Sequence, residues 1–468
     1  MRASIGWKAP ALALWVFCAS AQAADGDLDP SFGTDGFRIT GITDAYSIVP
    51  LGMAVQPDGK IVACGGEGTY PAVDFYVARF TADGELDASF SFDGRTTIDF
   101  GGNTDICNGL AIQTDGKIVV AGSTQPDGDP NVDFAVARLN ADGTLDTATF
   151  GAGTGKSVVG FDLGDTNADN VGSLVLKPDG RIVVAGYATT PSNGTDFAIL
   201  QLNTDGSRDT SFNLTGRATI GFDLAASANK NDVVTSIALD AQGRIVVAGS
   251  ADAGTAGGTD FAVARLLASG QPDPDFSADG RAVVAFDLGG ASGSNDDGAY
   301  AVTILHDGRI ALGGVTDSST TTDLNQDIAI VRLLPDGSPD ASFGFGGRTT
   351  LAFDLGPNGQ DLALGMIERS GGRLLLAGAA LQPSINGIVA AAVSLRRDGS
   401  PDPGFGTLGK RTYDFAQTTP SGQLFSGIGV QPGKGIVFTG VLNVVDSTHV
   451  DMFAARVLDD SIFADGFD

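Results

Sequence analysis

Aspartates are the side chains of this acidic chain that are most able to bind a ligand or a metal ion. A set of them falls in segments that differ in length and sequence from one part of the chain to the next: Asp162, Asp165, Asp169, Asp223, Asp232, Asp287, Asp296, Asp297, Asp354 and Asp361. Clustered carboxylates suit calcium, which takes six to eight oxygen ligands. None of these segments has the D-x-D-x-D-G pattern, and Asp25-Gly-Asp27-Leu-Asp29 is followed by Pro30 instead of glycine. We therefore expect mainly solvated turn carboxylates and no bound cofactor. Calcium remains open as an alternative, and its ligands are unknown.

The other candidate groups do not assemble into a catalytic pattern. His306 and His449 have no metal-ligand partner at a recognisable spacing, and no G-x-S-x-G nucleophile motif is present. The run GAGTGKS at 151–157 resembles a phosphate-binding loop, but its spacing is wrong and a strand, not a helix, is predicted to follow it. We expect no catalytic and no cofactor-binding residues, so the protein is predicted not to be an enzyme.

Cys64 and Cys107 are the two cysteines of the chain that follow its first 23 residues. Each is predicted to lie beside the same face of adjacent repeats. We hypothesise that they form a disulfide between these repeats, which requires Cα atoms within about 7 Å.

A repeat of about sixty residues must position all of these groups. The stretch IQTDGKIVVAG at 112–122 recurs as related sequences that place a basic residue at Lys60, Lys117, Arg181, Arg244, Arg309, Arg373 and Lys434. Such a period is typical of propellers, solenoids and repeat arrays.

One repeat is predicted to hold four strands. In the second copy these are 110–113, 117–121, 133–139 and 156–161, and Asp115-Gly116 is a hairpin signal between the first two. The run IVVA does not alternate, so both of its faces must be buried between stacked sheets. We predict an all-β fold, a single seven-bladed β-propeller with four antiparallel strands per blade. The alternative is an open β-solenoid or a pair of sandwiches.

The connection between the third and fourth strands repeats three residue types. An Asp, expected to cap a turn, falls at Asp29, Asp87, Asp146, Asp209, Asp273, Asp340 and Asp402. A Phe, expected to fill the gap between blades, falls at Phe32, Phe90, Phe150, Phe212, Phe276, Phe343 and Phe405. A Gly, expected to allow positive φ, falls at Gly36, Gly94, Gly155, Gly216, Gly280, Gly347 and Gly409.

The two ends of the repeat array complement each other. The N-terminal strand 37–40 is of the fourth type, whereas the last strand, 452–458, is of the third type. We expect the N-terminal strand to complete the last sheet and close the ring, which would remove an open sheet edge.

The N-terminus has the pattern of a secretory signal peptide. Residues 1–23 combine basic residues, a short apolar run and an Ala21-Gln22-Ala23 cleavage site. We expect residues 24–459 to form the propeller and residues 460–468 a short tail, in a protein that is secreted to the extracellular space, the cell surface or the periplasm. The net charge of −28 becomes −30 without Arg2 and Lys8, which disfavours nucleic acid and anionic membrane surfaces. No segment after residue 23 is long and apolar enough to predict membrane insertion.

The repeat resembles the bacterial delta-60 repeat family. The resemblance rests on the QPDGKIVVAG-like hairpin, the DFAVARLNADGTLD stretch and the SFG-x-x-GR connection, and it covers nearly all of the chain after residue 23. It implies an exported or surface β-propeller without an assigned activity. The chain departs from the pattern where Ser394 replaces the arginine of other copies and where Gly435 follows Lys434 in the last hairpin. We therefore expect the sixth and seventh blades to depart most from the common repeat.

We expect a monomeric, non-catalytic scaffold that binds a protein or glycan. Variable loops, such as 123–132 and 316–326, share one face of the propeller with the links between blades, and rigid scaffolds commonly bind through such loops. The alternatives are a hydrolase or lyase with a site at the central channel, or a purely structural surface protein. The starts of the first strands read GMAV, GLAI, GSLV, TSIA, YAVT, LALG and SGIG, which lack the residues expected of an enzyme.

Overall fold

In the residues that it describes, the computed structural model is all-β apart from three short 3-10 turns. It describes residues 24–40, 48–126, 131–164, 167–191, 194–224, 230–254, 258–288, 295–319, 325–356, 359–382, 387–415, 422–443 and 450–459. The predicted signal peptide, residues 1–23, and the predicted tail, residues 460–468, lie outside these ranges. No helix in the described residues is long and apolar enough to cross a membrane.

The strands fall into groups of four, which we number as units one to seven. Unit one is β2 (Ile48–Val55), β3 (Ile61–Thr69), β4 (Ala72–Phe80) and β5 (Arg95–Ile98); unit two is β6 (Gly102–Ile112), β7 (Ile118–Pro126), β8 (Asp133–Leu139) and β9 (Lys156–Val159). Unit three is β10 (Asp169–Leu176), β11 (Ile182–Thr190), β12 (Gly194–Leu202) and β13 (Arg217–Ile220); unit four is β14 (Val233–Leu239), β15 (Ile245–Gly254), β16 (Gly258–Leu266) and β17 (Arg281–Val284). Unit five is β18 (Asp297–Ile304), β19 (Ile310–Asp317), β20 (Gln326–Leu333) and β21 (Arg348–Leu351); unit six is β22 (Asp361–Arg369), β23 (Arg373–Gln382), β24 (Gly387–Leu395) and β25 (Lys410–Tyr413). Unit seven is β26 (Gln423–Gln431), β27 (Gly435–Asn443) and β28 (Val450–Val457), together with β1 (Phe37–Ile39).

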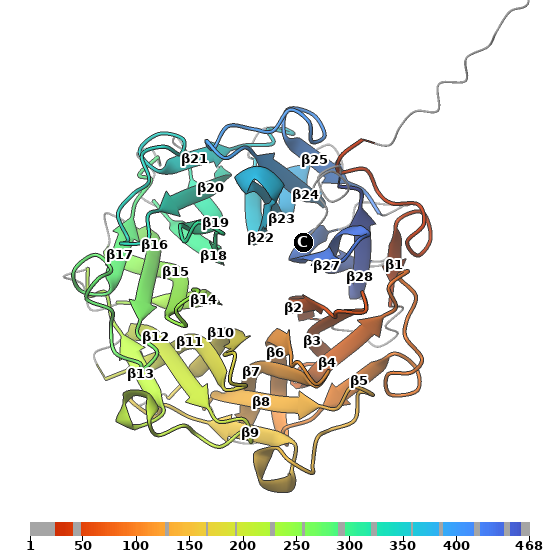
Figure 1. Ribbon diagram of the computed structural model, residues 1–468, viewed down its shortest axis with the longest axis vertical. Coiled ribbons are helices and arrows are strands. Elements are labelled where there is room, and N and C mark those ends of the chain that lie inside the picture. The colour runs from red at the N-terminus through yellow and green to blue at the C-terminus, as the bar shows by residue number, and fades with distance from the viewer. Residues whose placement is uncertain are drawn as a thin grey trace, which may run out of the picture.

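Antiparallel pairing joins the strands of each unit in chain order. Five units are separate four-stranded sheets, and units one and two share one eight-stranded sheet through the parallel pair Val73 and Thr104. In the last unit the order is β1-β28-β27-β26, because the N-terminal strand pairs antiparallel with the C-terminal one. Figure 1 shows the units following one another around a central axis, with β6, β10, β14, β18 and β22 nearest to it.

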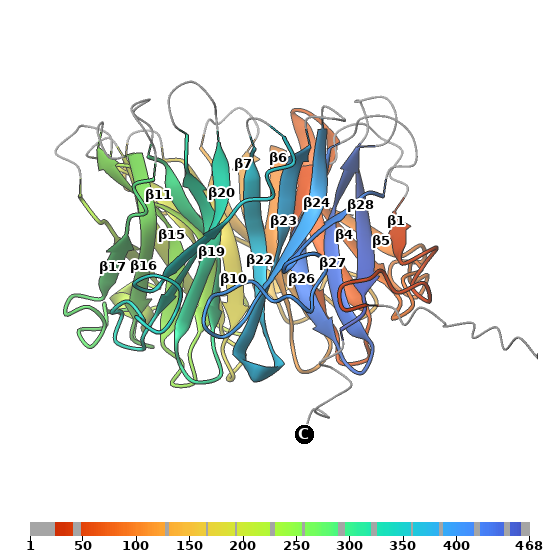
Figure 2. The same ribbon diagram turned by 90° about the horizontal axis from the view of Figure 1, so that it is seen from above.

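The middle strands form the core because neighbouring sheets cover both of their faces. Residues 118–123 of β7 are all buried, as the non-alternating sequence predicts, and Figure 2 shows the strands of successive units side by side. The repeated Phe is buried in every unit. Its ring lies against a turn glycine of the next unit, so that Phe90 contacts Gly143 and Phe150 contacts Gly206, as predicted for a residue that fills the gap between sheets.

A buried cation accompanies this Phe and ties each unit to the next. In unit one, Arg79 Nε lies 2.7 Å from Asp87 Oδ2, its guanidinium lies 4.7 Å from the centre of the Phe90 ring, and it donates to the Ala141 carbonyl of unit two. Asp87 Oδ1 also accepts the Ser89 N–H at 3.0 Å. The repeated Asp therefore caps its turn, as predicted, and in addition neutralises a buried arginine.

Two units supply this cation from the end of the first strand or from the loop after it, not from the third strand. In unit three the arginine position holds Gln201, and Lys177, on the loop after the first strand, donates to Gln201 Oε1 and to the Ala268 carbonyl. In unit six it holds Ser394, and Arg369 at the end of the first strand donates to Ser394 Oγ. The sixth unit, which the sequence suggested to be disturbed, thus keeps the four-stranded sheet.

Candidate functional site

A β-bulge recurs at the same position of the repeat and places its residues near the centre of the molecule. The pairing of the first strand with the second shifts register there in units two to seven. The extra residue of a bulge is left out of the ladder and re-aimed, which is why bulges are frequent beside binding sites. The residues at the six bulges are all different: Asn108, Gly172, Thr235, Tyr300, Leu364 and Ser426.

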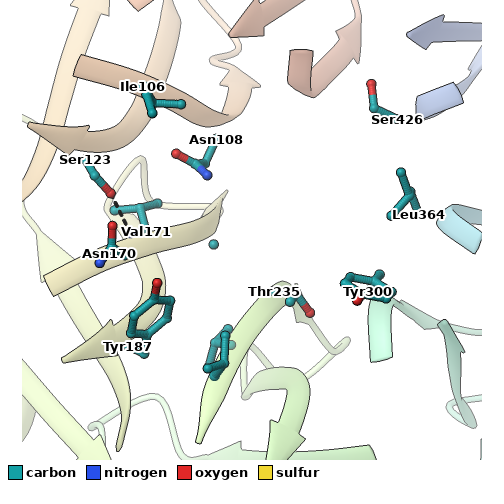
Figure 3. A pocket seen from close by; sticks show the side chains of 13 residues that line it. Ile106, Asn108, Ser123, Asn170, Val171, Tyr187, Thr235, Tyr300, Leu364 and Ser426 are labelled. Carbon is teal, nitrogen blue, oxygen red and sulfur yellow. Dashed lines mark hydrogen bonds between the residues drawn. The ribbon is translucent and has the colours of Figure 1, made fainter. Parts of the chain in front are cut away.

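These bulge residues line a cavity of about 430 Å³, within the usual size of small-molecule sites. Figure 3 shows the side chains of five of them around a common central space: Asn108, Thr235, Tyr300, Leu364 and Ser426. The rest of the lining comes from the neighbouring positions Ile106, Ser123, Asn170, Val171, Tyr187, Val233 and Val234. A regular scaffold therefore carries an irregular set of side chains at its axis.

The lining is aromatic, amide, hydroxyl and aliphatic in character. The Tyr300 side chain is 39% exposed. Partial burial raises the pKa of Tyr300 and of Tyr187 above the usual value, so both side chains are neutral phenols near pH 7. Ser123 Oγ accepts the Val171 N–H at 3.0 Å, which holds β7 against β10. The cavity thus presents flat apolar rings beside uncharged hydrogen-bonding groups.

Several of the aspartates singled out from the sequence are buried, and the expectation of solvated turn carboxylates is wrong for them. Asp169, Asp232, Asp297 and Asp361 are at most 1% exposed. Each lies at the start of the first strand of its unit or directly before it. Each accepts a hydrogen bond from the backbone N–H of a Phe that follows the fourth strand of the preceding unit, as Asp169 does from Phe161. These carboxylates fix the link between units. Burial raises the pKa of Asp169, Asp232 and Asp361 to about 6.

The other aspartates of that set occupy the links themselves. Asp162, Asp223, Asp287 and Asp354 have φ between 50° and 52°, the left-handed conformation that Asp tolerates better than most residues. Asp296 Oδ1 accepts the Thr259 N–H at 3.2 Å. Asp165 lies outside the described residues.

Cys64 and Cys107 lie together where units one and two meet. Cys64 is on β3 and Cys107 on β6, both are buried, and their Cα atoms are 5.8 Å apart in a disulfide. Of the two histidines, His306 is a turn residue whose N–H donates to Glu368, and His449 lies outside the described residues. The run 151–157 forms a 3-10 turn and the start of β9, as its place in the repeat predicts.

The sequence reasoning missed the cavity because a bulge leaves no strong mark in a single sequence. Tyr300 and Thr235 head two of the strand starts that were judged unremarkable, and Tyr187 sits on a second strand. The signal for the cavity in the sequence is that the residue type at this one position differs from repeat to repeat, whereas the residues around it are similar.

Several solved structures are similar to this chain at low sequence identity. The polysaccharide lyase Uly1 has a TM-score of 0.50 and 12% identity, over 94% of this chain and 98% of that chain. An ulvan lyase, described as a new family of polysaccharide lyase, has a TM-score of 0.47 and 10% identity over 92% and 94% of the two chains. Sqt1 from Chaetomium thermophilum has a TM-score of 0.43 and 14% identity over 90% and 97%. At 12% identity the likeness to Uly1 concerns the fold alone.

No curated protein matches the chain. A family model does match, five times in succession, at residues 56–90, 113–148, 177–212, 242–276 and 306–343. The matched segments begin at the first hairpin turn of units one to five. Four of them end at the buried Phe of the unit, and the second ends two residues before Phe150. These five segments match the repeat described as "Domain of unknown function (DUF5122) beta-propeller".

Proposed function

We propose that this protein is a non-catalytic binding protein whose central cavity takes a neutral glycan. The observation that carries the proposal is the ring of unlike bulge residues, from Asn108 to Ser426, around one cavity. The bulges recur although the side chains on them do not, which is the pattern expected when a scaffold is constant and a contact surface is specific.

The chemistry of the lining supports a sugar. A sugar ring has an apolar C–H face and an edge of hydroxyl groups. Tyr300 and Tyr187 offer aromatic faces, and Asn108 and Asn170 offer both donors and acceptors for hydroxyls. The apolar residues Val171 and Leu364 complete the wall.

Binding rather than catalysis is supported by the same lining. Glycoside hydrolysis uses a pair of carboxyl groups, and acid–base chemistry in general needs titratable groups at the reacting atoms. The thirteen residues that line the cavity include tyrosines, whose pKa values are raised, and no carboxylate, histidine, lysine or arginine.

The test is calorimetric titration with neutral oligosaccharides built from glucose, xylose, mannose and galactose. Replacing Tyr300 with Ala should weaken binding about tenfold, because a stacked aromatic ring contributes about 1–1.5 kcal/mol. The matched control is Tyr70→Ala, since Tyr70 is 70% exposed and is not part of the lining. Equal affinities of the Tyr300 variant and the unchanged protein, or no binding of any member of the panel, would disprove the proposal.

We further propose that the seven units are the blades of a closed ring, latched by β1. Two observations support closure: β2 and β26 lie side by side with Met53 against Gly427, and the chain of Phe contacts returns from Phe405 to Gly26. Deleting residues 24–40 would remove β1 and leave β28 as an open edge. We expect a large drop in the melting temperature; an unchanged melt would refute the latch.

The setting of the protein is inferred from its sequence. We propose that it is exported through its N-terminal segment, acts as a monomer, and belongs among the bacterial delta-60 repeat proteins. Its net charge of −28 supports a partner other than nucleic acid.

A further inference from the structure

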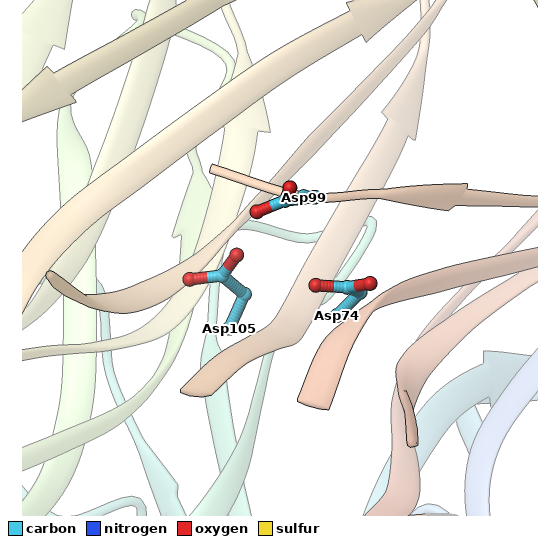
Figure 4. Close-up of side chains that lie close together, drawn as sticks. All are labelled: Asp74, Asp99 and Asp105. Carbon is cyan, nitrogen blue, oxygen red and sulfur yellow. The ribbon is translucent and has the colours of Figure 1, made fainter. Parts of the chain in front are cut away.

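Three carboxylates meet where units one and two join, and none of them is among the residues that line the central cavity. Asp74 lies on β4, Asp105 on β6, and Asp99 follows β5. One ligand oxygen from each lies within 4.8 Å of the others. Figure 4 shows the three carboxylates facing one another. Among the described residues, this is the group of acidic side chains that meets this distance criterion.

The buried member of the group has an unused oxygen. Asp105 is 0% exposed; its Oδ2 accepts the Phe100 N–H at 2.7 Å, whereas Oδ1 accepts no hydrogen bond within the described part of the chain. A buried carboxylate oxygen without a partner is costly, and each such group requires an explanation. Its exposed neighbour Asp99 leaves the cluster open to solvent on one side.

Three carboxylates this close repel one another, and a cation between them would remove that repulsion. Lys156 is the basic residue nearby, and its ammonium donates to the Asp99 backbone carbonyl.

The local structure holds the group in place. The link from Asp99 to Asp105 is shorter than the corresponding links 162–169, 223–232, 287–297 and 354–361. The parallel pair Val73 and Thr104 joins β4 to β6 beside the cluster, and the disulfide of Cys107 joins β6 to β3. The ligand atoms are thus preorganised across the junction of two units.

We propose that Asp74, Asp99 and Asp105 bind one divalent cation of the calcium type. The set is all oxygen and carries three carboxylates, which suits a hard cation, and calcium accepts irregular geometry with water completing its shell. The ion would use the free oxygen of Asp105 and join the first two units.

Unit six shows which substitution tests this without disturbing the fold. There Gln423 takes the place of Asp105 and accepts the Phe415 N–H through its amide oxygen at 2.8 Å, while Val389 takes the place of Asp74. An amide therefore keeps the backbone contact. Asp105→Asn removes the charge, and Asp414→Asn, in the unit that lacks the other two carboxylates, is the matched control.

The experiment is titration of the disulfide-bonded chain, stripped with chelator, with calcium chloride in a calorimeter, alongside thermal melts in calcium and in chelator. We expect saturable binding of calcium that weakens at least tenfold in Asp105→Asn and is unchanged in Asp414→Asn. At a hundredfold excess over the dissociation constant, the melting temperature should rise by about 3 °C. Absence of binding, binding that survives in Asp105→Asn, or binding of magnesium in preference to calcium would each overturn the proposal.

Discussion

Replacing Arg369 with Met should be among the most damaging single changes in this chain. Arg369 is buried at the end of β22, and its Nη2 lies 2.8 Å from Asp25 Oδ2 and also contacts Asp459. Its Nε lies 3.2 Å from the other oxygen of Asp459. Asp25 is 3% and Asp459 2% exposed, so the arginine holds two buried carboxylates from opposite ends of the described chain.

The expected loss of stability follows from the buried carboxylates of Asp25 and Asp459, which remain when Arg369 is replaced. Removing one partner of a buried ion pair costs about 3–5 kcal/mol, because the remaining charge has lost both water and its partner. An unfolding entropy of about 2.1 cal/mol/K per residue gives about 1.0 kcal/mol/K for a chain of 468 residues. The melting temperature should therefore fall by about 3–5 °C if the chain unfolds as one unit.

Calorimetric melting and hydrogen exchange together test this reasoning. The loss of stability should also be local, at the two segments that Arg369 holds. Backbone amides in 24–29 and 450–459 should therefore exchange faster than in the unchanged protein. The control is Arg397→Ala, because the Arg397 side chain is 65% exposed and its ion pair with Asp307, at 3.4 Å, should contribute little. A melting temperature within 1 °C of the unchanged protein, with unaltered exchange at both ends, would refute the account.

Two further predictions concern acid and thiol chemistry. The pKa values of Asp169, Asp232 and Asp361 are raised to about 6, so the folded state binds protons that the unfolded state releases between about pH 4 and 6. In chelator the melting temperature should therefore rise as the pH falls from 7.5 to 5, and Asp361→Asn should reduce that rise; a flat profile would contradict it. For Cys64 and Cys107, the intact mass without reductant should lack two hydrogens, and two free thiols would exclude the disulfide. The bridge closes a segment with a sequence separation of 43, and its loss should cost about 4 kcal/mol in the chain-entropy description.

The repeat allowed the strands and the core to be predicted from sequence. The hairpin turn, the buried run IVVA and the repeated Phe are local or periodic features, and the structure places them as expected. The predicted strand 133–139 coincides with β8. The predicted strand 110–113 overlaps only the end of a longer β6, which runs from Gly102 to Ile112 and whose earlier residues are less regular among the repeats.

The site was harder to predict because it depends on registers and on contacts between units. Tyr300 reaches the cavity through a bulge, and a bulge is defined by the partner strand. Asp169 looked like a loop carboxylate because its partner, the Phe161 N–H, precedes it by eight residues across a link of variable length. Ser394 looked like a defect because the compensating Arg369 lies on another strand of the same unit.

The buried cation stands at different positions in different units, and this limits where the repeats can be cut and recombined. Within a unit the positive charge comes either from the third strand, as with Arg138, or from the end of the first strand or the loop after it, as with Arg369 and Lys177. A chimera cut between those two strands would inherit two cations or none, and either result leaves buried charge unbalanced at the contact with the next unit. Cuts placed between units keep the pair of positions together, so whole units, not hairpins, are the pieces that protein engineering or gene duplication can exchange.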